Sequence, residues 1–79
     1  MDGKLAFEYD RVGDILYINK CAVYPEQEST EISAGVVARL NPQTQAVETL
    51  EILWFSRRMQ QGELFELPIE VDWQLAIAA

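Results

Sequence analysis

Carboxylates are the most plentiful reactive side chains in this 79-residue sequence, which has 13 acidic residues and no histidine. Without histidine, the usual general base, the Ser-His-Asp triad and the commonest metal ligand are missing. Asp10 and Asp14 flank one predicted turn, where two carboxylates could bind Ca²⁺ or work as an acid–base pair. Aspartates in turns also accept hydrogen bonds from nearby backbone amides. We expect this structural role, and therefore no catalytic, metal or cofactor site.

Neither the cysteine nor the glycines point to catalysis. Cys21 follows Lys20, but a cysteine nucleophile needs an activating base or a positive environment, and a lone cysteine is typically a small apolar side chain. The four glycines are scattered, so there is no glycine-rich phosphate loop. We predict that the protein is not an enzyme.

The basic residues Arg57 and Arg58 stand between Trp54 and Met59. Arginine, tryptophan and methionine are typical of protein interfaces. Trp54, Arg57, Arg58 and Trp73 are therefore the candidate protein contacts. The alternative is that Trp54 and Met59 belong to the core and both arginines are merely solvated.

The elements that position these residues are mostly strands. Residues 4–9 alternate between apolar and polar side chains, which is typical of a half-buried strand. Residues 10–14 form a turn in which Gly13 can adopt positive φ. Residues 15–19 are apolar at nearly every position, which indicates a strand covered on both faces, one of them by a second subunit if not by the chain itself.

The central element is a predicted antiparallel hairpin over residues 35–54. Asn41 and Pro42 are typical of the turn between its two apolar runs. Glu48 and Glu51 fall on opposite faces of its second strand, so one of them must lie in a partly covered place. Residues 21–33, which are acidic and interrupted by Pro25, are predicted to form a loop or an edge strand.

The period changes after the hairpin. Ser56 is the predicted N-cap of a short helix that ends at Gly62. Residues 69–75 alternate again, which predicts a last strand; a helix over residues 69–78, opened by Pro68, is the alternative. The predicted fold is α+β and mostly β: an antiparallel sheet of four to five strands built from hairpins, with one short helix near residues 56–61.

Length and composition indicate a single small domain, residues 1–79, that associates with itself. A domain of this size has a thin core and usually needs a disulfide, a metal or oligomerisation for stability. One cysteine cannot form an internal disulfide and the absence of histidine disfavours structural zinc, so a homodimer is expected.

The formal charge of −7 favours some partners over others. It disfavours nucleic acid and anionic membranes, and it permits a basic protein partner. The sequence shows no signal peptide and no stretch long enough to span a membrane, so a cytoplasmic location is expected.

Several motifs in order resemble a known family. The sequence resembles the prokaryotic domain-of-unknown-function family 2283 over about residues 7–54. The motifs that carry the resemblance are, in order, Tyr9-Asp10, Asp14-Ile15-Leu16-Tyr17-Ile18, an acidic stretch at 26–31, Gly35-Val36-Val37, a turn, and Leu50-Glu51-Ile52-Leu53. The sequence departs from the family where glycine is usual, in the second turn and before Ile-Glu-Ile. The resemblance implies a compact antiparallel sheet and brings no established activity.

Three functional hypotheses follow. The first is a non-enzymatic, dimeric protein-interaction module. The second is an acidic, antitoxin-like neutraliser of a basic partner in a two-gene cassette, a role sometimes suggested for similar small proteins, with residues 26–31 imitating nucleic-acid phosphates. The third is a carboxylate-based metal site or enzyme at Asp10 and Asp14, which lacks a third ligand or a nucleophile.

Overall fold

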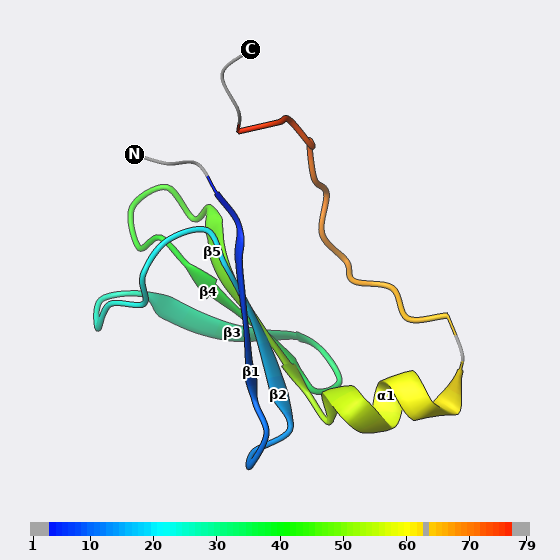
Figure 1. Ribbon diagram of the computed structural model, residues 1–79. Coiled ribbons are helices and arrows are strands. Elements are labelled where there is room, and N and C mark those ends of the chain that lie inside the picture. Colours follow the sequence, from blue (N-terminus) through cyan, green and yellow to red (C-terminus); the bar gives the residue numbers. More distant parts are fainter. Residues whose placement is uncertain (1–3, 63, 77–79) are drawn as a thin grey trace.

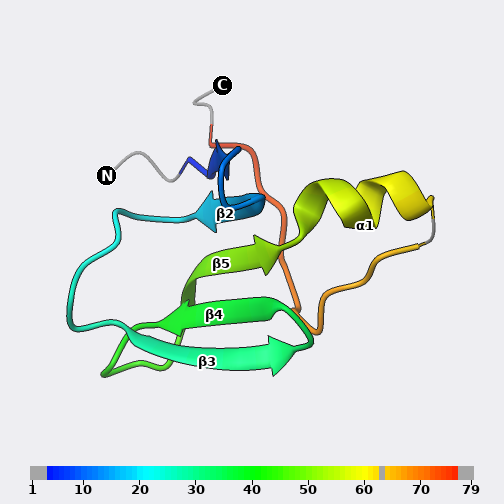
Figure 2. The ribbon, with the colours of Figure 1, turned by 90° about the horizontal axis from the view of Figure 1, so that it is seen from below.

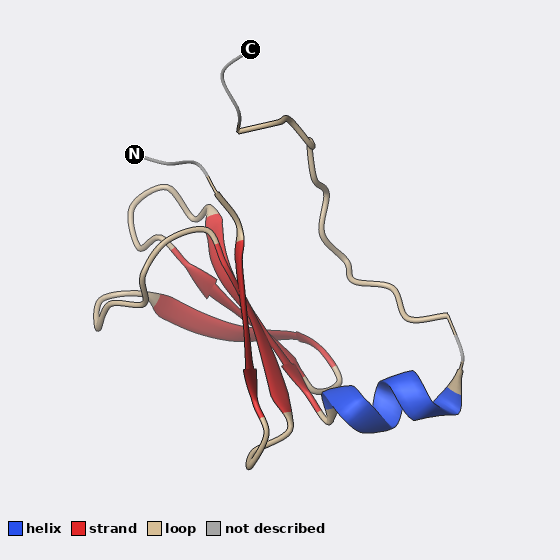
Figure 3. Cartoon of the chain, viewed as in Figure 1, coloured by secondary structure: helices blue, strands red, loops and turns tan. Residues whose placement is uncertain are grey.

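A computed structural model describes residues 4–62 and 64–76 of the chain. The described residues form one five-stranded antiparallel sheet and one short helix (Figure 1; Figure 3), which confirms the predicted fold class. The elements are β1 (Ala6–Asp10), β2 (Ile15–Asn19), β3 (Glu28–Ser33), β4 (Val36–Leu40), β5 (Val47–Leu53) and α1 (Phe55–Gln61).

The strand order is β1-β2-β5-β4-β3, so β5 is the middle strand and the predicted central hairpin is confirmed. The β1–β2 hairpin joins the β3–β4–β5 meander through the β2–β5 ladder (Figure 2). Residues 20–27 carry the chain from β2 to the far edge, where β3 is an edge strand, one of the two predicted possibilities for this acidic region. The β3–β4 register is irregular between Glu31 and Ser33.

Strand register gives the sheet two different faces because side chains alternate along each strand. One face, called here the apolar face, carries the side chains of Phe7, Tyr9, Leu16, Ile18, Val36, Ala38, Leu50 and Ile52. The other face is more polar, and there the Arg39 guanidinium pairs with the Glu51 carboxylate at 2.5 Å. Among the described residues, the buried apolar side chains are Val36, Ala38, Leu50 and Ile52.

The helix begins differently from the prediction. Trp54 occupies the N-cap position with φ 56° and makes no side-chain capping hydrogen bond, so the predicted Ser56 cap is wrong. The Ser56 amide instead donates to the Asp14 carboxylate, which caps the helix from 42 positions earlier in the chain. Gly62 ends the helix in the left-handed region, as predicted.

The first turn also differs from its prediction. Asp14, rather than Gly13, adopts positive φ (56°). Aspartate tolerates this region better than most residues because its short side chain forms local polar contacts. Here the left-handed backbone brings Asp14 to the start of α1.

Residues 64–76, called here the tail, form neither a strand nor a helix. The prediction of a last strand over residues 69–75 is therefore wrong. The alternative prediction of a helix is wrong as far as residue 76. The remainder of that alternative, residues 77–78, lies outside the described residues. The tail runs extended along the sheet (Figure 1) without joining it. Alternation supplies two-faced side chains, but a strand also needs a neighbour to satisfy its backbone groups. The described residues include no helix long and apolar enough to cross a membrane.

Candidate functional site

Trp54 directs the chain from the sheet into the helix. Its left-handed backbone, with φ 56° and ψ 39°, lies between the end of β5 and the start of α1. The indole ring lies so close to Gly35 that a Cβ atom at Gly35 would collide with it. About half of the Trp54 side chain stays exposed, so the predicted alternative of a core tryptophan does not hold.

Arg58 is fixed in place by backbone and aromatic contacts. Its Nε donates to the carbonyl of Leu53 at 2.8 Å and its Nη2 to the carbonyl of Ala34 at 2.6 Å. The guanidinium also lies 5.7 Å from the Trp54 ring centroid and 4.5 Å from that of Phe65, distances at which a cation is attracted to an aromatic face. Arg58 therefore joins β5, the β3–β4 turn, α1 and the tail.

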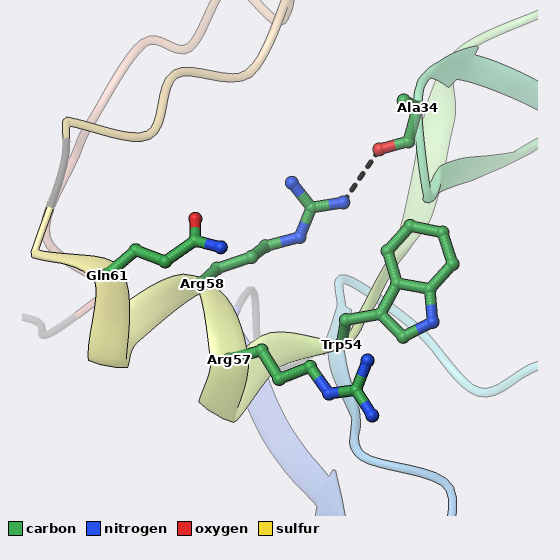
Figure 4. Close-up of a pocket in the computed structure, with 5 residues that line it drawn as sticks. All are labelled: Ala34, Trp54, Arg57, Arg58 and Gln61. Carbon is green, nitrogen blue, oxygen red and sulfur yellow. Dashed lines mark hydrogen bonds between the residues drawn. The ribbon is translucent and has the colours of Figure 1, made fainter.

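A shallow cavity of about 300 Å³ adjoins these residues. Figure 4 shows its lining, called here the arginine pocket: Ala34, Trp54, Arg57, Arg58 and Gln61. Arg57 is exposed, and no carboxylate of the described residues forms an ion pair with Arg57 or Arg58. Two cations and a half-exposed ring offer a contact for carboxylate and carbonyl groups. The pocket lining contains no nucleophile and no general base.

The fourth predicted contact residue lies elsewhere. Trp73 is on the tail, 74% exposed, and it lines a separate, larger cavity between the tail and the sheet. The structure thus brings Trp54, Arg57 and Arg58 together and leaves Trp73 apart.

The two aspartates considered for metal or acid–base chemistry make local and long-range structural contacts. Asp10 Oδ1 accepts hydrogen bonds from the amides of Val12 and Gly13. Asp14 accepts from the Tyr9 hydroxyl (2.5 Å), and from the amide and hydroxyl of Ser56 (2.9 Å each). Within residues 4–62 and 64–76, no group of three His, Cys, Asp or Glu side chains is arranged to hold a metal ion.

These hydrogen bonds change the acidity of both partners. The Tyr9 hydroxyl, followed by the Ser56 amide, lowers the pKa of the Asp14 carboxyl because both donate to its charged form. The same contact raises the pKa of Tyr9, since ionising the phenol would place it against a carboxylate. Asp14 therefore stays ionised and holds the β1–β2 turn against α1.

A second carboxylate contact network lies at the opposite end of the sheet. Glu48 accepts hydrogen bonds from Gln27 Nε2 (3.0 Å), the Tyr24 hydroxyl (2.6 Å) and Asn41 Nδ2 (3.1 Å). These donors, Gln27 first, lower the pKa of Glu48, and Glu48 raises the pKa of Tyr24 to about 12. Sequence spacing predicted that one of the two glutamates of β5 would be partly covered. In the structure both Glu48 and Glu51 are part-buried. The contacts of Tyr24 and Gln27 with Glu48 could not be predicted from the sequence, because these residues lie 24 and 21 positions before it.

Sequence reasoning also missed that the apolar face is exposed on its β1 side. Phe7 is 62% exposed there, Tyr9 is exposed as well, and the half-buried side chains of β2 lie beside them. Exposed apolar patches of this kind are common where proteins interact. The period-two pattern predicted which side chains share a face, but not that Val36, Ala38, Leu50 and Ile52 are buried there while Phe7 and Tyr9 on β1 stay exposed.

A scan of family models, a search of curated proteins and a search of solved structures each found no match to this chain. The resemblance to the domain-of-unknown-function family 2283 therefore stays a prediction.

Proposed function

We propose that this chain is a non-enzymatic protein-interaction module that works as a homodimer. The observation that supports it is the surface area. The chain exposes 6298 Å², whereas compact monomers of 9.0 kDa expose about 4900 Å². The surplus exceeds the roughly 800 Å² that each partner contributes to a standard interface.

The apolar face is the proposed dimer contact. It is the side of the sheet on which large apolar side chains such as Phe7 and Tyr9 stay exposed. The arginine pocket is the proposed second contact, for a protein partner that presents carboxylates. Trp54, Arg57 and Arg58 supply the cations and the aromatic surface there, and Trp73 belongs with the apolar contacts on the tail.

Light scattering coupled to size-exclusion chromatography tests the homodimer. The expected mass is twice the 9.0 kDa of the chain. Phe7→Ser should weaken dimerisation about tenfold or more, because burying a large apolar side chain contributes about 1.5–3 kcal/mol. Glu8→Ser, on the same strand but the opposite face, is the matched control. A monomeric mass at every concentration, or equal effects of the two variants, would refute the proposal.

The second candidate function is neutralisation of a basic partner. The supporting observation is β3, an exposed edge strand that carries Glu28 and Glu31 and continues the acidic stretch from Glu26. An edge strand offers unpaired backbone groups to a partner, and its carboxylates would attract a basic one. We propose no metal site at Asp10 and Asp14, because their carboxylates accept hydrogen bonds from Val12 and Ser56.

A further inference from the structure

The tail and the apolar face form the two walls of a large open cavity. Its volume is about 1700 Å³, well above the roughly 300–1,000 Å³ of small-molecule pockets. The sheet wall includes Leu5, Phe7, Ile18 and Leu50. A cavity of this size between two walls of one chain has room for a further layer of protein.

The tail wall is rich in apolar side chains, and those toward its far end remain exposed. The half-buried side chains of Phe65, Leu67 and Ile69 and the exposed side chains of Val71 and Trp73 line the cavity. Glu70, Asp72 and Gln74, which alternate with them, reach the same cavity at its solvent side. Trp73 is 74% exposed, and Leu75, beyond it, is 89% exposed. The tail therefore carries apolar side chains that its own sheet does not cover.

The start of the tail is tied to the end of the sheet beside α1. Helix α1 extends beyond the end of the sheet (Figure 2), and the tail follows Gly62 at its far end. The ring of Phe65 then packs on the guanidinium of Arg58. That guanidinium donates hydrogen bonds to the backbone carbonyls of Leu53 and Ala34. Beyond this anchor, the tail and the apolar face line the same open cavity.

The overall dimensions agree with an incomplete unit. The radius of gyration is 13.5 Å, whereas a compact domain of 79 residues has about 11.6 Å. The surplus surface described above is roughly 1400 Å², enough for an interface larger than the standard one.

We propose that residues 69–75 of one copy cover the apolar face of a second copy, and that the exchange is reciprocal. This inference rests on the proposed homodimer and adds its geometry. Ile69, Val71, Trp73 and Leu75 alternate with Glu70, Asp72 and Gln74. An extended segment of this pattern buries one side and keeps its charged side in water. A twofold axis makes both contacts identical, so two tails cover two faces and no apolar face is left over.

The exchange accounts for the alternation of a segment that forms no strand within its own chain. The pattern at residues 69–75 is the clearest alternation in the sequence, yet the segment stays unpaired when one copy stands alone. In the dimer, the same alternation faces the apolar face of the partner.

Disulfide trapping between two differently tagged copies tests the exchange. Both copies carry Cys21→Ser; one also carries Phe7→Cys and the other Trp73→Cys. After mixing at high concentration and mild oxidation, the expected product is a disulfide between the two tags, at twice the chain mass. Glu8→Cys in place of Phe7→Cys is the matched control, because residue 8 points to the opposite face of β1, and it should give at least tenfold less product.

The remaining outcomes separate the exchange from the homodimer. A dimeric mass without the mixed-tag product would overturn the exchange and leave the homodimer standing. A monomeric mass, together with an internal disulfide in a copy that carries both Phe7→Cys and Trp73→Cys, would overturn both. Isotope-filtered NMR on a mixture of labelled and unlabelled wild-type protein needs no substitution: contacts of the Trp73 ring to Phe7 across the two chains are expected, and contacts within one chain would overturn the exchange.

Discussion

Trp54 occupies a backbone conformation that large side chains rarely adopt, and its surroundings explain why it stays there. Its ring lies on Gly35, whose own φ is +72°, and against the guanidinium of Arg58. A left-handed residue costs about 1–2 kcal/mol, so the contacts of the ring must outweigh that cost. Two left-handed positions thus meet where β5 ends, and only glycine leaves room for the ring.

Gly35→Ala should therefore destabilise the protein more than Gly62→Ala. Both positions have positive φ, +72° and +69°, so both variants bear the left-handed cost of about 1–2 kcal/mol. Only at Gly35 does the new methyl group also collide with Trp54 and Arg58, which should cost at least about 1 kcal/mol more. Urea denaturation at one fixed protein concentration measures both free energies of unfolding. Equal losses would mean that the ring moves aside without cost.

The candidate contacts were partly predictable from the sequence. Trp54, Arg57 and Arg58 are close in sequence, so any short helix after a strand places them near one another. Ala34 comes from the β3–β4 turn, and only the fold brings it to the same pocket. Trp73 was grouped with them by residue type alone, and the structure places it on the tail.

Helix α1 depends on a residue far away in the chain. A seven-residue helix is too short to be stable alone, and α1 has no side-chain cap of its own. The Asp14 carboxylate, at the end of the β1–β2 turn, accepts from Ser56 and supplies the missing cap. The T-shaped packing of Tyr9 on Phe55, with ring centroids 6.1 Å apart, strengthens the same junction.

This junction should weaken in acid. The pKa of Asp14 is lowered from 3.8 in the folded protein, so its contribution is fully present above pH 3.8 and is lost as the pH falls through the folded pKa. Asp14→Asn should be less stable than the wild type at pH 7, and the difference should shrink below pH 3.8. Thermal unfolding measured across pH tests this, with Glu8→Gln as a control for the loss of one charge. A difference that stays constant down to the lowest pH would contradict the charged cap.

At the level of elements, local patterns predicted what depends on local chemistry. Alternation located β1, continuous apolar runs and turn residues located β2, β4 and β5, and glycine located the end of α1. The same alternation at residues 69–75 failed because a strand requires a second strand at ladder distance, and sequence period does not report whether one is there. The helix cap failed for a similar reason: Ser56 has the right residue type, but the acceptor comes from 42 positions away.

At the scale of the whole molecule, net charge and exposed apolar surface have opposite effects on self-association. Each copy carries a formal charge of −7, so two copies repel, while the exposed apolar surface favours their association. At 0.1 M salt, repulsion between like charges is largely screened when they are more than about 10 Å apart. The homodimer should therefore bind more tightly as salt is added.

Sedimentation at about 0.05 M and about 0.5 M salt tests this, with a severalfold lower dissociation constant expected at the higher concentration. The direction separates the two candidate functions, because a complex between the acidic edge strand and a basic partner weakens as salt rises. A homodimer that dissociates on adding salt would show that ion pairs, rather than the apolar face, hold it together.

The two edges of the sheet are unequal, and this limits how large an assembly can grow. An endless filament would need β1 of one copy to pair with β3 of the next. Glu28 and Glu31 oppose such pairing, and the irregular register between Glu31 and Ser33 bends the strand that would have to accept it. With one edge guarded in this way, we expect head-to-tail polymerisation to be disfavoured and the proposed exchange of tails to give a closed pair.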